Sequence, residues 1–391
     1  MQKRDVEKQL EVIKRGTVEI ISEAELKNKL EESVREKRPL IVKAGFDPTA
    51  PDIHLGHTVL LRKMRQFQDL GHEVIFLIGD FTGRIGDPSG RSEIRKQLTK
   101  EEVVKNAATY KKQVSKVLDT EKLRIVFNSG WFEKMSVLDI LNLTTHTTVS
   151  QMLAREDFKK RLAKGEDISL LEFMYPLLQG YDSVKLEADI ELGGTDQIFN
   201  LLVGRDIQKD FAQAPQVVIT MPLLEGTDGV QKMSKSSGNY IGINEAPFEM
   251  LGKIMSISDE LMFKYYELLT DEDLAEIKRM HPKEAKLRLA QNIVRQYHSQ
   301  EAAREARLEF ERVFARKELP QDLAEYKTDK SQTIITILLK SGLVKSGNEA
   351  RRLLAQGAVI FNERKIDKED FKIEVSGTLK VGARRFLRVT V

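Results

Sequence analysis

Two short clusters of reactive side chains lie far apart in this chain of 391 residues. The first is His54-Leu55-Gly56-His57 and the second is Lys232-Met233-Ser234-Lys235-Ser236. Imidazole N–H groups can donate hydrogen bonds to phosphoryl oxygens, and lysine ammonium groups can neutralise phosphate charge. Taken together, the two clusters indicate an ATP-dependent enzyme that activates a carboxylate as an adenylate.

The histidine cluster is expected at the start of a helix. An apolar run over residues 40–46 predicts a buried strand, the polar residues 47–52 end it, and a helical apolar pattern continues to Gly71. His54 and His57 then share one face of the first turn, where free N–H groups favour phosphate. Gly56 leaves room for a nucleotide. The alternative interpretation is a pair of surface histidines that cap a helix.

The lysine cluster is expected on a mobile surface loop. It follows a predicted buried strand at 217–224, and glycines flank it within residues 225–238. Lys232 and Lys235 can meet the β- and γ-phosphates of ATP, with the hydroxyl groups of Ser234 and Ser236 beside them. The alternative is an ordinary solvated basic loop.

Composition limits the possible classes of protein. The absence of cysteine excludes disulfides and thiolate zinc sites, and the six scattered histidines argue against a structural metal. No apolar run is long enough for a membrane helix, and the charged segment 1–16 lacks the apolar core of a signal peptide. We therefore expect a cytoplasmic protein with no membrane partner.

The order of the predicted elements indicates an α/β fold. Strands are expected at 40–46, 74–79, 124–127, 188–192 and 216–221 with helices between them, which is typical of a Rossmann-like parallel sheet. A helical insertion is expected near 131–165, a helical region at 245–318, and a polar linker at 321–330. The predicted domains are 1–224 (catalytic), 225–330 (lysine loop and helices) and 331–391 (a small α+β domain).

The last 61 residues differ in charge from the rest of the chain. Residues 331–391 hold twelve Lys and Arg against six Asp and Glu, whereas the remainder is slightly acidic. A helix that begins at the Ser346-x-x-Glu349 capping box exposes Arg351 and Arg352, and a strand follows it. This arrangement resembles the S4 RNA-binding domain. A basic face that only contacts solvent is the alternative.

The paired HxGH and KMSKS motifs resemble the signature of class I aminoacyl-tRNA synthetases. Over essentially the whole chain, the closest resemblance is to the bacterial tyrosyl-tRNA synthetase family. The segments that carry it are Gly45-Phe46-Asp47-Pro48-Thr49, Ile85-Gly86-Asp87-Pro88-Ser89-Gly90, Tyr175-x-x-x-Gln179-x-x-Asp182 and Gly193-Gly194-Thr195-Asp196-Gln197.

The resemblance implies a role for each of these segments. The catalytic groups would be His54, His57, Lys232 and Lys235. Asp87, Tyr175 and Gln179 would hold the tyrosine ammonium group with Asp47 close by, Asp182 would accept from the phenol, and Gln197 would lie by the carboxylate. Gly193 and Asp196 would hold the ATP ribose. From the residues alone, the 175–182 stripe could also be satisfied core polar groups, and Thr195-Asp196 a simple helix N-cap.

One departure from the family is informative. Lys43 stands where the much-studied branch has a tyrosine that helps to bind the phenol, and KMSKS replaces that branch's variant loop, which indicates the second bacterial branch. The resemblance implies ATP with Mg²⁺, L-tyrosine and tRNA-Tyr as partners, and a homodimer with the insertion as interface. Two rival interpretations are a tryptophanyl-tRNA synthetase and an RNA-binding protein that has lost catalysis.

Overall fold

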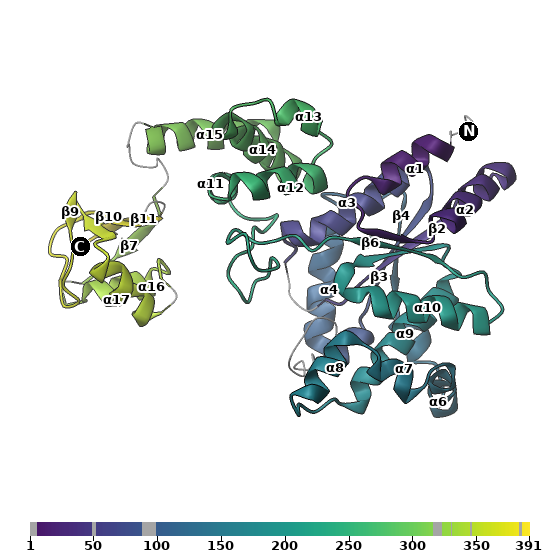
Figure 1. Cartoon of the computed structure of the whole chain (residues 1–391). Coiled ribbons are helices and arrows are strands. Elements are labelled where there is room, and N and C mark those ends of the chain that lie inside the picture. Colours follow the sequence, from purple (N-terminus) through teal and green to yellow (C-terminus); the bar gives the residue numbers. More distant parts are fainter. Residues whose placement is uncertain are drawn as a thin grey trace. The chain divides into compact units, whose positions relative to one another are not determined.

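The computed structural model describes residues 6–48, 52–87, 99–315, 323–329, 331–344, 346–382 and 385–391. The motif residues Thr49 and 88–90, and parts of the predicted linker, lie outside these residues. A six-stranded sheet forms the centre of the amino-terminal part of the structure. The strands are β1 (Glu19–Ile21), β2 (Ile41–Phe46), β3 (Glu73–Ile78), β4 (Leu123–Phe127), β5 (Ile190–Gly194) and β6 (Val217–Met221). Their order across the sheet is β1-β6-β5-β2-β3-β4 (Figure 1).

Strands β2 to β6 are parallel, so the predicted Rossmann-like α/β sheet is confirmed. The chain moves outward from β2 to β3 and β4, then returns to β5 and β6 on the other side of β2. This reversal makes the gap between β2 and β5 the topological switch point, where such sheets bind ligands at the carboxyl ends of their strands. The short edge strand β1 was not predicted, and it pairs antiparallel with β6.

Helices connect the parallel strands and cover the sheet, as parallel strands require. The helices outside the insertion are α1 (Val6–Lys14), α2 (Glu23–Glu36), α3 (Leu55–Leu70), α4 (Lys100–Val114), α9 (Leu170–Leu186) and α10 (Ile198–Asp210) (Figure 1). Helix α3 ends as predicted at Gly71, whose φ of 88° suits a residue without a side chain. Helix α9 begins at a Ser169–Glu172 capping box, and it packs closely against α10.

The predicted insertion between β4 and α9 is helical. It contains α5 (Ser129–Phe132), α6 (Val137–Leu143), α7 (Val149–Leu153) and α8 (Glu156–Ala163). The predicted helical region after the lysine loop is also observed, as α11 (Pro247–Met255), α12 (Asp259–Leu269), α13 (Leu274–Ile277), α14 (Pro282–Tyr297) and α15 (Gln300–Ala315). Among the described residues, no helix has the length and apolar character needed to cross a membrane.

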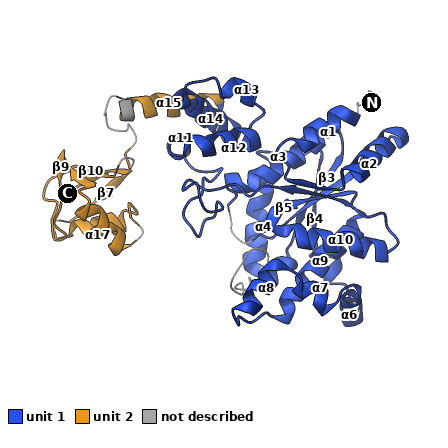
Figure 2. Ribbon diagram, in the orientation of Figure 1, with its two compact units in different colours: residues 1–246, 253–299 blue, residues 247–252, 300–391 orange. Residues whose placement is uncertain are grey.

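The chain divides into two compact units, residues 1–246 with 253–299 and residues 247–252 with 300–391 (Figure 2). The second unit ends in a sheet ordered β7-β11-β10-β8-β9, whose strands are β7 (Glu325–Lys327), β8 (Val359–Phe361), β9 (Arg364–Lys365), β10 (Gly377–Val381) and β11 (Arg385–Thr390). The three predicted domain boundaries stay a prediction.

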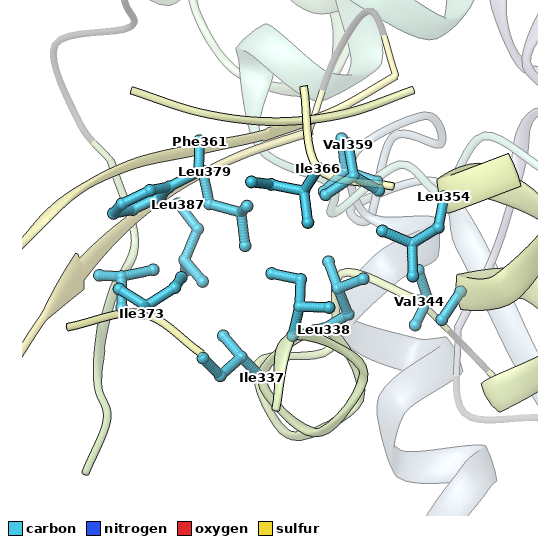
Figure 3. Close-up of a cluster of buried hydrophobic side chains, with 14 residues drawn as sticks. Ile337, Leu338, Val344, Leu354, Val359, Phe361, Ile366, Ile373, Leu379 and Leu387 are labelled. Atoms are coloured by element: carbon cyan, nitrogen blue, oxygen red, sulfur yellow. The ribbon is translucent and has the colours of Figure 1, made fainter. Parts of the chain in front are cut away.

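Two helices complete this small α+β sub-structure, α16 (Ile334–Lys340) and α17 (Gly347–Ala355). Ile337 and Leu338 of α16 and Leu354 of α17 pack against apolar side chains of the strands (Figure 3). The Ser346 hydroxyl accepts from the Glu349 N–H at 3.2 Å, so the predicted cap of α17 is present. The Glu349 carboxylate also accepts from Arg385 at 2.9 Å.

Candidate functional site

A cavity of about 500 Å³ lies in the first unit, at the carboxyl ends of β2 and β5. This is the switch point of the sheet, so the topology alone places a ligand site here. Both sequence clusters line the cavity although they are some 175 positions apart. The predicted site residues in its wall are Asp47, His54, Gly56, His57, Asp87, Tyr175, Asp196, Gln197, Lys232, Ser234, Lys235 and Ser236.

The two histidine rings lie together at the start of α3, with centroids 3.8 Å apart. The backbone N–H of His54 donates to Nδ1 of His57 at 3.2 Å, so a neutral His57 carries its proton on Nε2. Burial lowers the pKa of His54 to about 2 and that of His57 to about 4, and the nearby lysine charges act in the same direction. Both rings are therefore neutral at pH 7 and act as hydrogen-bond groups.

Gly56 joins the histidine cluster to the lysine loop. Its N–H donates to the sulfur of Met233 at 3.3 Å, and Met233 is buried. A Cβ atom at residue 56 would lie 3.0 Å from the His54 ring and 3.5 Å from Met233. The structure thus gives Gly56 a packing role, because its missing side chain lets Met233 anchor the loop over the start of α3.

The lysines of the loop form ion pairs across the cavity. Lys232 Nζ lies 2.7 Å from Asp196, and Lys235 Nζ lies 2.7 Å from Asp52. The loop itself is non-helical as predicted, and the Ser234 N–H donates to Asn239 at 2.8 Å. The loop therefore places two positively charged groups at the cavity, and such groups can pair with phosphate as well as with carboxylate.

A group of acceptors lies deeper in the cavity, between α9 and the start of α10. The Tyr175 hydroxyl donates to Asp47 at 2.9 Å, and Gln197 donates to Asp87 at 3.4 Å. Burial and the Asp47 and Asp87 carboxylates hold the pKa of Tyr175 well above its usual value, so it stays a neutral phenol. Two carboxylates with a neutral hydroxyl between them suit a bound ammonium group.

Asp182 lies beneath this group and is nearly inaccessible to solvent, with 2% exposure. Trp131 Nε1 donates to one of its oxygens at 3.0 Å, and Asn128 donates to the other at 3.3 Å. Burial raises the pKa of Asp182 to about 7, while Lys43 and the two donors act in the opposite direction. A buried carboxylate with donors on both oxygens is suited to accept a further hydrogen bond from a hydroxyl group.

Lys43 is fully buried on β2, beneath the same pocket. Its ammonium group lies 3.0 Å from Glu191 on β5 and donates to the backbone carbonyl of Gln179 at 3.3 Å. Glu191 also accepts from the Gln179 side chain at 3.0 Å. The lysine is therefore partnered with Glu191, and its charge reaches Asp182 through space.

Three of the residues predicted for the ATP and tyrosine sites do not line the cavity. Gln179 and Asp182 lie below its wall, on the same face of α9 as Tyr175, as their spacing predicts. Gly193 is closely packed, because a Cβ there would lie 2.8 Å from Leu201 and 3.1 Å from the Gln197 side chain. In the second unit, Arg351 and Arg352 are exposed on α17, and Arg351 pairs with Glu369 at 3.0 Å.

Sequence reasoning missed five residues that support the site: Asp52, Asn128, Trp131, Glu191 and Asn200. Asn200 was detectable, because it lies three residues after Gln197 and so on the same face of α10. Trp131 was also detectable as the only tryptophan of the chain. Asn128 and Glu191 lie on or next to strands that meet α9 only in the tertiary structure.

Comparison with known proteins agrees with this geometry. Residues 11–315 match the family described as tRNA synthetases class I (W and Y). The chain is 55% identical to the tyrosine–tRNA ligase of Carboxydothermus hydrogenoformans and 54% identical to that of Aquifex aeolicus, in each case over 98% of both proteins.

Solved structures show the same likeness. A tyrosyl-tRNA synthetase of Archaeoglobus fulgidus in complex with L-tyrosine is 25% identical, with a TM-score of 0.63 over 78% of this chain and all of that chain. A C-terminally truncated mitochondrial tyrosyl-tRNA synthetase of Aspergillus nidulans, at 23% identity and a TM-score of 0.65, covers 80% of this chain and 95% of that chain, and supports the fold.

Proposed function

Because this chain belongs to the tyrosine–tRNA ligases of the class I tRNA synthetase family, we propose that the cavity at the carboxyl ends of β2 and β5 is its active site. The reaction activates L-tyrosine with ATP to tyrosyl-adenylate, releases pyrophosphate, and transfers tyrosine to the 3′ end of tRNA-Tyr. The observation that carries the proposal is the meeting of the histidine and lysine clusters in one cavity.

The first step is attack of the tyrosine carboxylate on the α-phosphate of MgATP. No side chain acts as nucleophile, so the rate depends on positioning and on stabilising the charge that develops on the phosphates. His54 and His57 serve as neutral donors, with the Nε2 proton of His57 held in place by its Nδ1 contact. Lys232 and Lys235 move from their carboxylate partners to the β- and γ-phosphates.

The nucleotide sugar is held on the opposite side of the cavity. Asp196 is released when Lys232 turns to phosphate, and its carboxylate then accepts from the ribose hydroxyls. Ser234 and Ser236 line the same wall and complete the set of ATP contacts. Gly193 acts by packing, since it allows the turn that carries Asp196 to lie close to Leu201.

The amino acid lies with its ammonium group among Asp87, Tyr175 and Gln179, with Asp47 behind Tyr175, and with its carboxylate near Gln197. Its phenol hydroxyl donates to Asp182, whose oxygens are already oriented by Trp131 and Asn128. A tryptophan substrate would bring an indole N–H to a different position, so this acceptor favours a phenol. Lys43 supports the pocket from below through Glu191.

The helical insertion is the proposed interface of a homodimer. Four large apolar side chains on α6 and α7 are strongly exposed, namely Val137 (79%), Leu138 (66%), Leu141 (56%) and Val149 (64%). Clustered exposed apolar side chains of this size are typical of interaction surfaces. Sedimentation of the full chain tests the proposal, because a monomer at micromolar concentration would contradict it.

Residues 331–391 are the proposed S4-like tRNA-binding domain, after a catalytic domain at 1–224 and a helical domain at 225–330. Support comes from the charge excess of this segment and from the exposure of Arg351 and Arg352 on α17. Phosphate contacts of this kind make affinity fall steeply with salt concentration.

Pyrophosphate exchange tests the proposed function directly. The full chain with MgATP should incorporate labelled pyrophosphate into ATP when L-tyrosine is added, and far more slowly with L-tryptophan or L-phenylalanine. Exchange driven by tryptophan would point to the other member of the same family model. Binding of tRNA without any amino-acid-dependent exchange would indicate an RNA-binding protein without catalysis.

A further inference from the structure

Asn200 on α10 is fully buried next to the proposed ammonium site. Its Nδ2 group donates to Gln179 Oε1 at 3.1 Å and to Asp87 Oδ1 at 3.4 Å. Its Oδ1 atom accepts from the Arg155 guanidinium at 3.1 Å. One amide therefore contacts two of the three groups proposed to hold the substrate ammonium.

Charged groups at the two ends of this series of hydrogen bonds determine which way the Asn200 and Gln179 amide groups point. A guanidinium has only donors, so the oxygen of Asn200 must face Arg155 and its NH₂ group must face Gln179. At the other end, Gln179 Nε2 donates to Glu191 at 3.0 Å, and Lys43 balances that carboxylate. The oxygen of Gln179 is thereby turned toward Asn200, with a second lone pair left over.

The same arrangement orients Asp87. Asn200 holds one of its oxygens and Gln197 the other, both at 3.4 Å. Each carboxylate oxygen has more than one lone pair, so an oxygen that accepts from one of these amides can also accept from a cation. The Tyr175 hydroxyl donates to Asp47 and so also presents lone pairs. Asp47, Asp87 and Tyr175 thus present oxygen acceptors of the kind that an ammonium group requires.

Arg155 itself is held rigidly at the start of α8, within the insertion. It is buried, it pairs with Asp157 at 2.7 Å, and its guanidinium lies 4.9 Å from the Phe158 ring and 5.6 Å from the Phe199 ring. The two rings and Asp157 restrict the guanidinium group, and this keeps its Nη1 donor directed at Asn200.

We propose that Asn200 is a positioning residue for the ammonium group of the amino-acid substrate, and that Arg155 of the insertion fixes the orientation of its amide. The inference rests on the proposed function, since it assigns the ammonium of tyrosine to Asp87, Tyr175 and Gln179. It adds that the specificity for an α-amino group is set from outside the cavity, by an arginine that contacts no substrate atom.

The affinities of three ligands distinguish a positioning role of Asn200 from a purely structural role. L-Tyrosine and tyramine carry the ammonium group, whereas 3-(4-hydroxyphenyl)propanoate keeps the phenol and the carboxylate but lacks it. In the full-length Asn200→Leu protein, which conserves side-chain volume, the Kd of tyrosine and of tyramine should rise about tenfold or more. The Kd of 3-(4-hydroxyphenyl)propanoate should change by less than about twofold. Calorimetry or competition binding measures all three.

The control is Gln208→Ala, which removes another buried amide from the same helix. Gln208 donates to the Ala188 carbonyl at 3.0 Å and accepts from the Gln216 N–H at 2.7 Å, away from the ammonium group. This change should lower thermal stability, while the Kd values of the three ligands should shift equally or not at all. If Asn200→Leu does not fold, Asn200→Ser provides the same comparison in a smaller side chain.

Arg155→Met tests the orienting role. This substitution should raise the Kd of tyrosine and of tyramine, as Asn200→Leu does, because Asn200 can then turn its NH₂ group away. The Kd of 3-(4-hydroxyphenyl)propanoate should stay nearly unchanged. The proposal would be overturned if the Asn200 variants raised the Kd of all three ligands equally, or raised none of them. An effect at Asn200 without one at Arg155 would overturn the role of the arginine. Failure of the proposed function is distinguishable, because the unmodified protein would then fail to bind tyrosine.

Discussion

Replacing Asp182 with asparagine should remove a pH-dependent loss of stability while destroying the selectivity for tyrosine. Burial raises the pKa of this carboxyl from 3.8 to about 7. In the unfolded chain Asp182 ionises near 3.8, but the native protein keeps the proton until about pH 7, so stability falls as the pH rises between these values. Each pKa unit corresponds to about 1.4 kcal/mol, and the full penalty above pH 7 is therefore about 4 kcal/mol.

Asparagine keeps the volume of the side chain but cannot ionise. The free energy of unfolding of the Asp182→Asn protein, minus that of the unmodified protein, should grow by roughly 2–3 kcal/mol between about pH 5 and pH 8. Denaturant titrations of both proteins across this range measure the difference. A difference that does not change with pH would show that Asp182 does not titrate there, and the reasoning about its burial would be refuted.

The same substitution should affect recognition of the phenol. Phenylalanine brings no hydroxyl to Asp182 and also displaces water from the buried site, so the carboxylate loses the hydrogen bond that the phenol would donate, which costs about 3 kcal/mol or about a hundredfold in kcat/KM. Asp182→Asn should lose most of this discrimination and much of the activity with tyrosine. Pyrophosphate exchange with each amino acid gives the ratio. Near-normal selectivity in the variant would place the phenol site elsewhere.

Three further changes test other parts of the site. Lys235→Ala should slow tyrosyl-adenylate formation about a hundredfold in pre-steady-state kinetics and leave tyrosine affinity nearly unchanged, because its phosphate contact strengthens as charge develops. The pKa values of about 2 and 4 for His54 and His57 predict that neither ring titrates between about pH 6 and 8, so the rate of tyrosine activation should show no histidine inflection in this pH range. An inflection in the pH–rate profile that disappears in the His57→Asn protein would contradict their neutral role. Arg352→Glu should raise the KM for tRNA and flatten its salt dependence while pyrophosphate exchange is retained, and unchanged charging kinetics would count against the basic helix as the tRNA contact.

Much of the fold followed from local pattern. Each of the five parallel strands is a short, mainly apolar run, and this pattern needs no tertiary information. The stop of α3 at Gly71 and the cap of α17 at Ser346 are equally local, because a single side chain or its absence satisfies the helix end. The edge strand β1 escaped notice because three residues carry too little pattern and its pairing with β6 is distant in the sequence.

The sequence also determined which residue types could act on ATP. Two histidines three apart before a helix, and two lysines in a glycine-flanked loop, were sufficient to predict the chemistry, since phosphate demands donors and positive charge. Their meeting in one cavity depended on the topology. Only the reversal of strand order at β2 and β5 brings the two clusters to the same edge of the sheet.

Protonation states and partners were decided by the tertiary structure alone. The shifted pKa values of His54, His57 and Asp182 come mainly from burial, which depends on all the elements packed around each side chain. Lys43 illustrates the same point, because the sequence left its partner undetermined and the fold pairs it with Glu191 on β5. A residue's type fixes what bonds it can make, whereas its partners are set by strands and helices that are distant in the chain.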